Sequence, residues 1–247
     1  MKKHTFIGPI LLILIWAVVA KLQLVDRFFL PDPFTTIGKL FQLLASGAII
    51  GDLIATLDRV VIAFIIALVI GLPLGLLLGR SEKIYRGVEF IIDFFRSTPA
   101  SALFPLFLLV FGITDISKIA VAAFASMLII IFNTAYGVMH AKKSRILAAQ
   151  IMGATKTQIF RWILFWESLP QTFIGLRSAV SLSLVLIIVT EMFIGTTSGL
   201  GRKIIDSQIT YEIPTMYATI LLAGIVGYLL NLLFLVLEKR FLHWSAK

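Results

Sequence analysis

The sequence predicts an all-α, polytopic membrane protein with six transmembrane helices. Of its 247 residues, 59% are hydrophobic and 14% are charged, whereas a soluble domain carries about 25% charged residues. The mean hydropathy is +1.01. A helix that crosses a bilayer core needs about 20 predominantly apolar residues. Six runs approach or exceed this length, at roughly 6–21, 53–79, 88–112, 118–139, 173–195 and 214–237.

The first apolar run has two interpretations. Lys2 and Lys3 precede it and the letters WAVVA end it, which is also the pattern of a cleaved signal peptide. If the run is retained as a span, the number of spans is even and both termini lie on the same side of the membrane. We expect the retained span, and we interpret residues 1–247 as a single transmembrane domain.

Lys and Arg in the connections predict the orientation. With a cytoplasmic N-terminus, the inner connections hold more of these residues than the outer ones, as the positive-inside rule requires. Both termini are then cytoplasmic, and so is a long half-polar segment at about 140–172.

The composition also bears on other classes of function. The net charge of +9 does not indicate a nucleic-acid partner, because the basic residues are spread between apolar runs and form no dense stripe. The chain has no cysteine, and its three histidines are too scattered to suggest a metal site. We therefore expect the lipid bilayer, not nucleic acid, to be the chain's environment.

The cytoplasmic segment predicts two short helices that meet at a bend. Residues 144–165 contain no proline and a single glycine, Gly153, so we expect the bend there. Thr155 and Lys156 present polar groups beside it, and Pro170 should end the second helix before the fifth span. Small side chains at the bend leave room for another chain to approach closely: Ala148, Ala149, Gly153 and Ala154. The alternative is an amphipathic helix that rests on the inner leaflet.

The same segment resembles a known motif. The EAA motif of permease subunits of ATP-binding cassette importers is matched here by Ala148, Ala149, Gly153, Ile163, Leu169 and Pro170. The resemblance extends to the stretches FFRSTPASALFPLFLLVFGI, GLRSAVSLSLVLIIVTEMFIGTTSGLG and LPLGLLLGRS, and it covers nearly the whole chain. It is similar to the permease group that serves nitrate, taurine and alkanesulfonate importers. Leu147 stands where the motif opens with Glu, so a polar contact made there in relatives is missing or supplied elsewhere.

The resemblance implies a transport function with defined partners. In such transporters the cytoplasmic loop is a coupling helix that fits a groove on a separate ATPase subunit. The implied complex is a homodimer of this permease with two ATPase subunits and an external substrate-binding protein, in the cell membrane. The coupling residues that it implies are Ala148, Ala149, Gly153, Ala154, Thr155, Lys156, Leu169 and Pro170. Small organic or inorganic anions (sulfonate, taurine, nitrate) or vitamin precursors are the substrates expected from the resemblance.

ATP should bind to a partner of this chain. The sequence contains no G-x-x-x-x-G-K-S/T phosphate loop, and its inner segments are too short to fold a nucleotide-binding domain. ATP and Mg²⁺ would therefore be held by the ATPase subunit, and we expect no cofactor in this chain.

Charged residues inside the predicted spans are candidates for the translocation path or its gates, because such groups are costly in a bilayer. Arg177 and Asp93 lie at similar depths from the inner surface, which predicts a pair of Arg177 with Asp93 or Glu89. Separate snorkelling to the headgroups is the alternative. Near the outer surface, Arg59 and Glu191 are the candidates for a second pair.

Arg96 lies deeper in its span, next to the letters STPASALFP. It either faces the central path, where it would attract anions, or is satisfied by carbonyl groups freed around Pro99. The residue alone does not separate these two interpretations.

Three further patterns concern packing. Gly71, Gly75 and Gly79 form a ladder of small residues suited to close helix contact. After Pro33, apolar residues at helical spacing predict a one-faced helix along the outer surface, formed by Ile37, Leu40, Phe41 and Leu44. The letters TTSGLGRKIIDSQITYEIP predict a glycine-containing outer loop before the sixth span.

Two other functions compete with a permease, namely an intramembrane enzyme and a membrane scaffold without transport activity. An enzyme would need a convergent set of catalytic groups, whereas Glu89 and Asp93 are i,i+4 neighbours without a plausible metal partner. A scaffold would not require the EAA-like spacing together with the outer GLG letters. We therefore expect a permease and not an enzyme.

Overall fold

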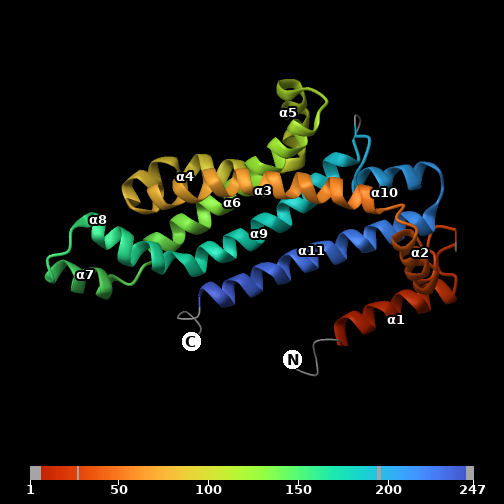
Figure 1. Ribbon diagram of the computed structural model, residues 1–247, viewed down its shortest axis with the longest axis horizontal. Helices are drawn as coiled ribbons and strands as arrows, with labels where there is room; N and C mark the ends of the chain where they lie inside the picture. The colour runs from red at the N-terminus through yellow and green to blue at the C-terminus, as the bar shows by residue number, and fades with distance from the viewer. Residues whose placement is uncertain (1–6, 27, 194–195, 243–247) are drawn as a thin grey trace.

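Four long apolar helices form the body of the protein. The computed structural model describes residues 7–26, 28–193 and 196–242, and every regular element in these ranges is a helix. The long helices run along the longest axis of the molecule (Figure 1). They are α3 (Ile50–Gly79), α6 (Asp115–Met139), α9 (Phe165–Glu191) and α11 (Ile213–Phe241). All four are long and apolar enough to cross a membrane, as predicted for the runs at 53–79, 118–139, 173–195 and 214–237.

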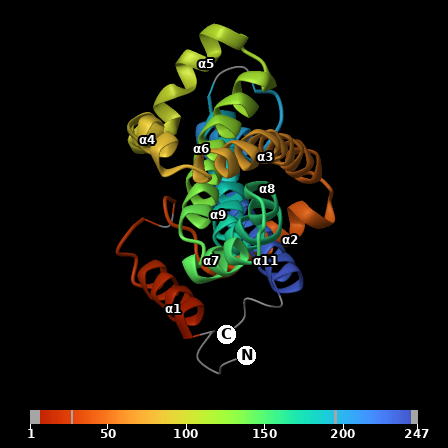
Figure 2. The same ribbon diagram turned by 90° about the vertical axis from the view of Figure 1, so that its left-hand side faces the viewer.

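The six-span count is not confirmed. The run at 88–112 is split into α4 (Glu82–Ser97) and α5 (Phe104–Phe111), with the short 3₁₀ turn Ala100–Leu103 between them, and the two parts are bent by 90°. Pro99 causes the break, because a residue before proline avoids the helical region and Thr98 is accordingly extended, with ψ at 129°. Figure 2 shows α4 and α5 on one side of the helix body.

The first apolar run is shorter than a span. In the described part of the chain it forms α1 (Ile7–Lys21), whose 15 residues extend about 22 Å at a rise of about 1.5 Å per residue, against a hydrocarbon core of about 30 Å. The described residues thus provide four candidate spans, or five if the bent pair counts as one.

Helix α6 lies at the centre of the body, between α3 and α9. The expected close contact of the glycine ladder is confirmed: a Cβ atom on Gly75 would lie 2.7 Å from Thr134 Cβ, and one on Gly79 would lie 2.7 Å from the Ala135 carbonyl oxygen. Where α6 meets α9, Ser126 and Ser183 share a hydrogen bond of 2.7 Å. Inside a bilayer, helices have no hydrophobic driving force to associate. Close backbone packing and hydrogen bonds between hydroxyl groups therefore hold them together.

Two short helices cap the end of the body where α3 and α9 have their outer termini, as drawn on the right of Figure 1. The helix expected after Pro33 is α2 (Pro33–Ala45), and Asp32 caps it by accepting the backbone N–H groups of Phe34 and Thr35. It packs on α11 with Thr36, Leu40 and Leu43 buried, whereas Phe41, expected on the packed face, is exposed. The outer loop predicted after residue 195 is wrong in part, because residues 200–209 form the helix α10 (Leu200–Ile209).

The segment predicted to be cytoplasmic lies at the other end of the body, as α7 (Lys143–Ile151) and α8 (Lys156–Ile159). A single π-helical turn, Phe160–Leu164, leads from α8 into α9 without an intervening loop. The prediction that Pro170 ends a helix is therefore wrong. The helix α9 continues through this proline to Glu191, as prolines in membrane helices commonly allow.

Candidate functional site

The bend between α7 and α8 is a well-defined turn. Gly153 has φ at +81°, a left-handed conformation that L-residues with a Cβ adopt with strain. Its N–H donates to the Gln150 carbonyl at 3.0 Å, and the N–H of Ala154 donates to the Ala149 carbonyl at 2.9 Å. These bonds close the C-terminus of α7. The position of the bend at Gly153 is thus confirmed.

Thr155 starts α8 with a capping box. Its backbone N–H donates to Gln158 Oε1 at 2.7 Å, and its hydroxyl oxygen accepts the Gln158 backbone N–H at 3.3 Å. Such reciprocal bonds satisfy two N–H groups that a helix start would otherwise leave without partners. The turn from α7 into α8 is therefore held in one shape by its own hydrogen bonds.

Six of the eight expected coupling residues lie on this exposed α7–α8 unit. They are Ala148, Ala149, Gly153, Ala154, Thr155 and Lys156. Leu169 and Pro170 instead lie half-buried within α9. The most exposed apolar side chains of the unit are Ile151, at 87%, and Met152, at 85%. Sequence reasoning did not single these two out, although apolar letters directly before a bend glycine were the available signal.

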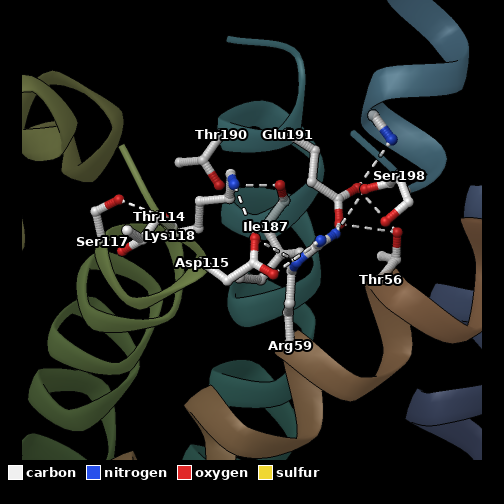
Figure 3. Close-up of polar contacts among 12 residues, drawn as sticks. Thr56, Arg59, Thr114, Asp115, Ser117, Lys118, Ile187, Thr190, Glu191 and Ser198 are labelled. Carbon is white, nitrogen blue, oxygen red and sulfur yellow. Dashed lines mark hydrogen bonds and ion pairs between the residues drawn. The ribbon is translucent and has the colours of Figure 1, made fainter. Parts of the chain in front are cut away.

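A second site lies at the end of the helix body that the sequence predicts to be the outer one, where Figure 3 shows charged residues of α3, α6 and α9 pointing toward one another. We call Thr56, Arg59, Asp115, Lys118 and Glu191 the outer ion cluster. At its centre the Glu191 side chain is fully buried. Its carboxylate accepts hydrogen bonds from Arg59 Nη1 at 2.7 Å and from Thr56 Oγ1 at 2.8 Å. The pair of Arg59 with Glu191 considered from the sequence is thus present.

Arg59 connects three segments of the chain. Besides Glu191 in α9, it donates to the Ser198 carbonyl at 2.8 Å and forms a two-pronged contact with the Asp115 carboxylate at 3.1 Å for both nitrogens. Lys118, which is 2% exposed, donates from Nζ to the same carboxylate at 2.8 Å. Buried charges are stable only when paired and hydrogen-bonded. Each charged group of the outer ion cluster has an ion-pair partner and at least one hydrogen bond, although Arg59 Nε has the ion pair to Asp115 and no hydrogen bond.

Helix α10 begins on top of this cluster. The Gly201 N–H donates to Glu191 Oε2 at 3.0 Å, and the Leu200 N–H donates to Thr56 Oγ1 at 2.8 Å. A carboxylate is well placed there, because the N-terminus of a helix carries partial positive charge. A Cβ atom on Gly199 would lie 2.4 Å from Glu191 Cδ, and one on Gly201 would lie 2.1 Å from the Ile188 carbonyl oxygen. The letters GLG are therefore required for α10 to close over Glu191.

The inner charge pairs differ from those predicted. Arg177 lies 3.9 Å from Glu238 of α11, and Asp93 pairs with Arg96 of its own helix at 3.1 Å. The predicted pairing of Arg177 with Asp93 or Glu89 is wrong because α4 packs on α6 and α3, whereas Arg177 of α9 faces α11.

Arg96 stacks on an aromatic ring. Its guanidinium carbon lies 3.7 Å from the centre of the Phe132 ring of α6, a cation–π contact. Together with the pair to Asp93, this contact accounts for the charge without the carbonyl groups around Pro99, which were the alternative expected from the sequence. A third of the Arg96 side chain stays exposed.

A comparison with protein families decides what kind of molecule carries these two sites. The model of the family described as "Binding-protein-dependent transport system inner membrane component" matches residues 71–243, which include α7, α8 and Glu191. The chain belongs to this family. It is a membrane protein and the permease subunit of an ATP-binding cassette (ABC) importer of the binding-protein-dependent type.

Named relatives of this permease are transport proteins rather than enzymes. The taurine transport system permease protein TauC of Escherichia coli strain K12 is 28% identical over 241 residues, which cover 96% of this chain and 87% of the relative. The riboflavin transport system permease protein RibX of Chloroflexus aurantiacus is 30% identical over 236 residues, with 96% and 88% covered. The family resemblance noted from the sequence is thereby confirmed.

Solved permeases share the fold. An inward-facing structure of the MetNI methionine ABC transporter superposes with a TM-score of 0.63 at 24% identity and covers 75% of this chain and 92% of that one. An amino acid ABC transporter structure gives a TM-score of 0.63 at 19% identity, with 81% and 97% covered. The helix arrangement of this permease is therefore that of ABC importer subunits.

Sequence reasoning missed three members of the outer ion cluster, namely Thr56, Asp115 and Lys118. A signal was available for all three. Asp115 and Lys118 are i,i+3 neighbours at the edge of the predicted span 118–139, and Thr56 and Arg59 have the same spacing in the predicted span 53–79. It also missed Glu167, which bonds to the start of α7. For Glu167 the sequence held no such signal, since its partners lie more than twenty positions away in the chain.

Proposed function

We propose that this permease forms a substrate translocation path and couples it, through the α7–α8 unit, to a separate ATPase subunit. The observation that carries the proposal is the exposed apolar tip of the unit, Ile151 and Met152, beside a turn that its own hydrogen bonds hold in shape. Exposed apolar side chains on a polar segment are typical of a surface that a partner covers. ATP and Mg²⁺ would bind to that partner, in keeping with the absence of a phosphate loop from the sequence.

The complex that fits this proposal is a homodimer of the permease with two ATPase subunits and an external substrate-binding protein. The solved structures that share this fold are of ABC transporters, which supports an assembly of this kind. In this arrangement α7 and α8 lie in the cytoplasm together with both termini, and α10 lies at the outer surface. The six-segment count stays a prediction, with α1 and the bent pair of α4 and α5 as the two irregular segments.

The charged residues divide between the two ends of the path. We place Arg59 and Glu191 at its outer end, where the outer ion cluster would gate access. Toward the inner end, Arg177, Arg96 and Asp93 keep part of their side chains exposed. Exposed charge at the depth of a span is costly against lipid and favourable beside water, which supports a place for these three residues near an aqueous path.

The proposed substrates are small organic or inorganic anions such as a sulfonate, taurine or nitrate, with vitamin precursors as the second class. Taurine and riboflavin appear in the names of relatives that cover almost the whole chain, and so does formylaminopyrimidine. Binding of these compounds would be selected mainly by the external binding protein, and the cationic side chains of the path favour the anions.

ATP hydrolysis tests the division of labour. The permease should be purified alone and together with the proposed ATPase subunit, and both preparations assayed for hydrolysis. We expect hydrolysis only from the complex, with stimulation by the loaded binding protein in proteoliposomes. Appreciable hydrolysis by the permease alone would show that it needs no separate ATPase.

A further inference from the structure

Besides its covalent link to α6 through residues 140–142, the start of α7 is held to the helix body by one side chain of α9. Glu167, in the first turn of α9, accepts the Lys142 backbone N–H at 3.3 Å and forms an ion pair with the Arg145 guanidinium. The Glu167 side chain is 13% exposed and that of Arg145 is 59% exposed. Lys142 is the N-cap residue of α7 and supplies no side-chain cap. The carboxylate therefore takes the place of a cap, where negative charge also complements the helix dipole.

Glu167 stands on a rigid base. Directly after it, Ser168 packs against α6 so closely that a Cβ atom on Gly137 would lie 2.8 Å from the Ser168 carbonyl oxygen. One turn further, Gln171 Nε2 donates to Asn133 Oδ1 at 2.9 Å, again between α9 and α6. The first turns of α9 and the last turns of α6 therefore move as one body.

Two covalent connections join the α7–α8 unit to this base: residues 140–142 link α6 to α7, and the π-helical turn Phe160–Leu164 links α8 to α9. In this turn the Phe165 N–H donates to the Phe160 carbonyl, five residues back. Such turns are rare, they insert one extra residue into a helix, and they occur frequently at functional sites. A wide turn of this kind is the place where the unit would tilt relative to α9 if nothing else held it.

We propose that Glu167 is a positioning residue that fixes the angle of the α7–α8 unit on the α6–α9 base. When the ion pair between Glu167 and Arg145 is formed, a displacement of α7 is transmitted to the spans. When the ion pair is broken, the π-helical turn bends instead, and the spans do not move. This inference rests on the proposed coupling function, and it adds a contact outside the expected coupling residues. It also names a carboxylate, supplied by α9, that holds α7 in a chain where Leu147 occupies the motif's Glu position.

The test follows the motion of the outer end in the assembled complex. Thr197 is exposed at that end, and the chain has no cysteine, so Thr197→Cys gives a single reporter for an impermeant maleimide. Labelling rates are compared with and without ATP and vanadate, alongside ATP hydrolysis, in proteoliposomes containing the ATPase subunits. The changes made in this background are Glu167→Gln, Arg145→Gln and the exchange Arg145→Glu with Glu167→Arg.

We expect both single changes to retain ATP hydrolysis and to reduce the nucleotide-dependent change in labelling at least about fivefold, the lower end of usual coupling between sites. The exchange of the two residues should restore at least about half of the nucleotide-dependent change in labelling, because the exchange rebuilds the ion pair with reversed signs. Lys143→Gln is the matched control. It removes a positive charge from the same turn of α7, no ion pair of Lys143 is found among the described residues, and it should respond like the parent.

Two results overturn the inference in different ways. If the parent complex itself shows no nucleotide-dependent labelling, the proposed coupling function fails and the role of Glu167 fails with it. If labelling of the parent changes with nucleotide, and labelling of Glu167→Gln and Arg145→Gln changes by the same amount, the coupling function is supported and the positioning role of Glu167 is wrong. A loss in the single variants without recovery in the exchange would also contradict it, since a purely local packing defect would then explain the loss.

Discussion

Glu191 shows how a single residue can organise one end of a membrane protein. Full burial of a carboxylate is unfavourable by several kcal/mol unless its charge and its lone pairs are satisfied. Here Arg59, Thr56 and the Gly201 N–H all bond to it. These partners come from α3 and α10, so the cost of burying one charge is offset only when three helices are in place.

Removal of Arg59 should show how strongly the stability of the protein depends on the partners of Glu191. In Arg59→Met the Glu191 carboxylate stays buried without its counter-ion, and we expect a loss of about 3–5 kcal/mol of stability, as for other broken buried pairs. The double variant Arg59→Met with Glu191→Gln removes the stranded charge and should recover more than half of the loss. Thermal unfolding of the purified permease in detergent measures both. Equal destabilisation by the single and double variants would show that the charge of Glu191 is not what Arg59 compensates.

Gly153 allows a test at the bend that separates backbone strain from contact. No atom lies within 4 Å of a Cβ built on this residue, so any effect inside the chain comes from its φ of +81°. Valine is strongly disfavoured there, whereas asparagine is enriched in the left-handed region. We expect Gly153→Val to keep membrane insertion and expression and to lose ATPase co-purification and substrate uptake, and Gly153→Asn to stay near the parent in both.

The alternative for this segment predicts a different pattern. A helix that only rests on the inner leaflet would gain helicity when glycine is replaced, since glycine costs about 1 kcal/mol relative to alanine in a helix interior. Wild-type co-purification and uptake in Gly153→Val, at normal protein level, would therefore favour the leaflet helix over coupling.

Among the elements, α3 and α6 depend most on the absence of side chains. Gly75 lies against Thr134, and a Cβ atom there would come within 2.7 Å of it. Gly75→Leu should push the helices apart and destabilise the permease by about 1–3 kcal/mol, as overpacking typically does. Gly51→Leu in the same helix is the control, because nothing lies within 4 Å of its Cβ position. The thermal unfolding temperatures of the two variants, measured in detergent, should differ. Equal temperatures would show that the close contact at Gly75 does not contribute to stability.

The elements also show what the sequence could predict. Runs of apolar residues predicted the four long helices, since length and hydropathy alone decide whether a helix suits a bilayer. They could not predict the 90° bend at Pro99, because a hydropathy profile does not report the direction in which two consecutive helical segments run. The same rule for proline misled at Pro170, where the helix continues to Glu191, because a missing N–H and a kink do not always end a helix inside a membrane.

The charge pairs differ in predictability for a geometric reason. Depth in the membrane was inferred from position along a span, and it suggested both the pair of Arg59 with Glu191 and the pair of Arg177 with Asp93. Only the first is found. Depth fixes one coordinate, whereas a pair also requires the two helices to face each other, and that depends on packing that the sequence alone did not reveal.

At the scale of the whole molecule, orientation is the property open to direct measurement. The α7–α8 unit and α10 lie at opposite ends of the helix body (Figure 1), so one exposed residue from each end reports on sidedness. With single cysteines at Thr155 or Thr197, an impermeant reagent applied to intact cells should label Thr197→Cys and leave Thr155→Cys unlabelled. The reverse pattern would place the α7–α8 unit outside the cell and overturn the positive-inside assignment.

The outer ion cluster has an electrical consequence. With all four groups ionised, Arg59 and Lys118 carry two positive charges and Asp115 and Glu191 carry two negative ones. Moving one net elementary charge through the full membrane potential takes about 2.3 kcal/mol per 100 mV. A cluster whose charges cancel can shift within the membrane field without doing that work. We therefore expect a rigid shift of this cluster to add no dependence on the membrane potential to conformational change at that end.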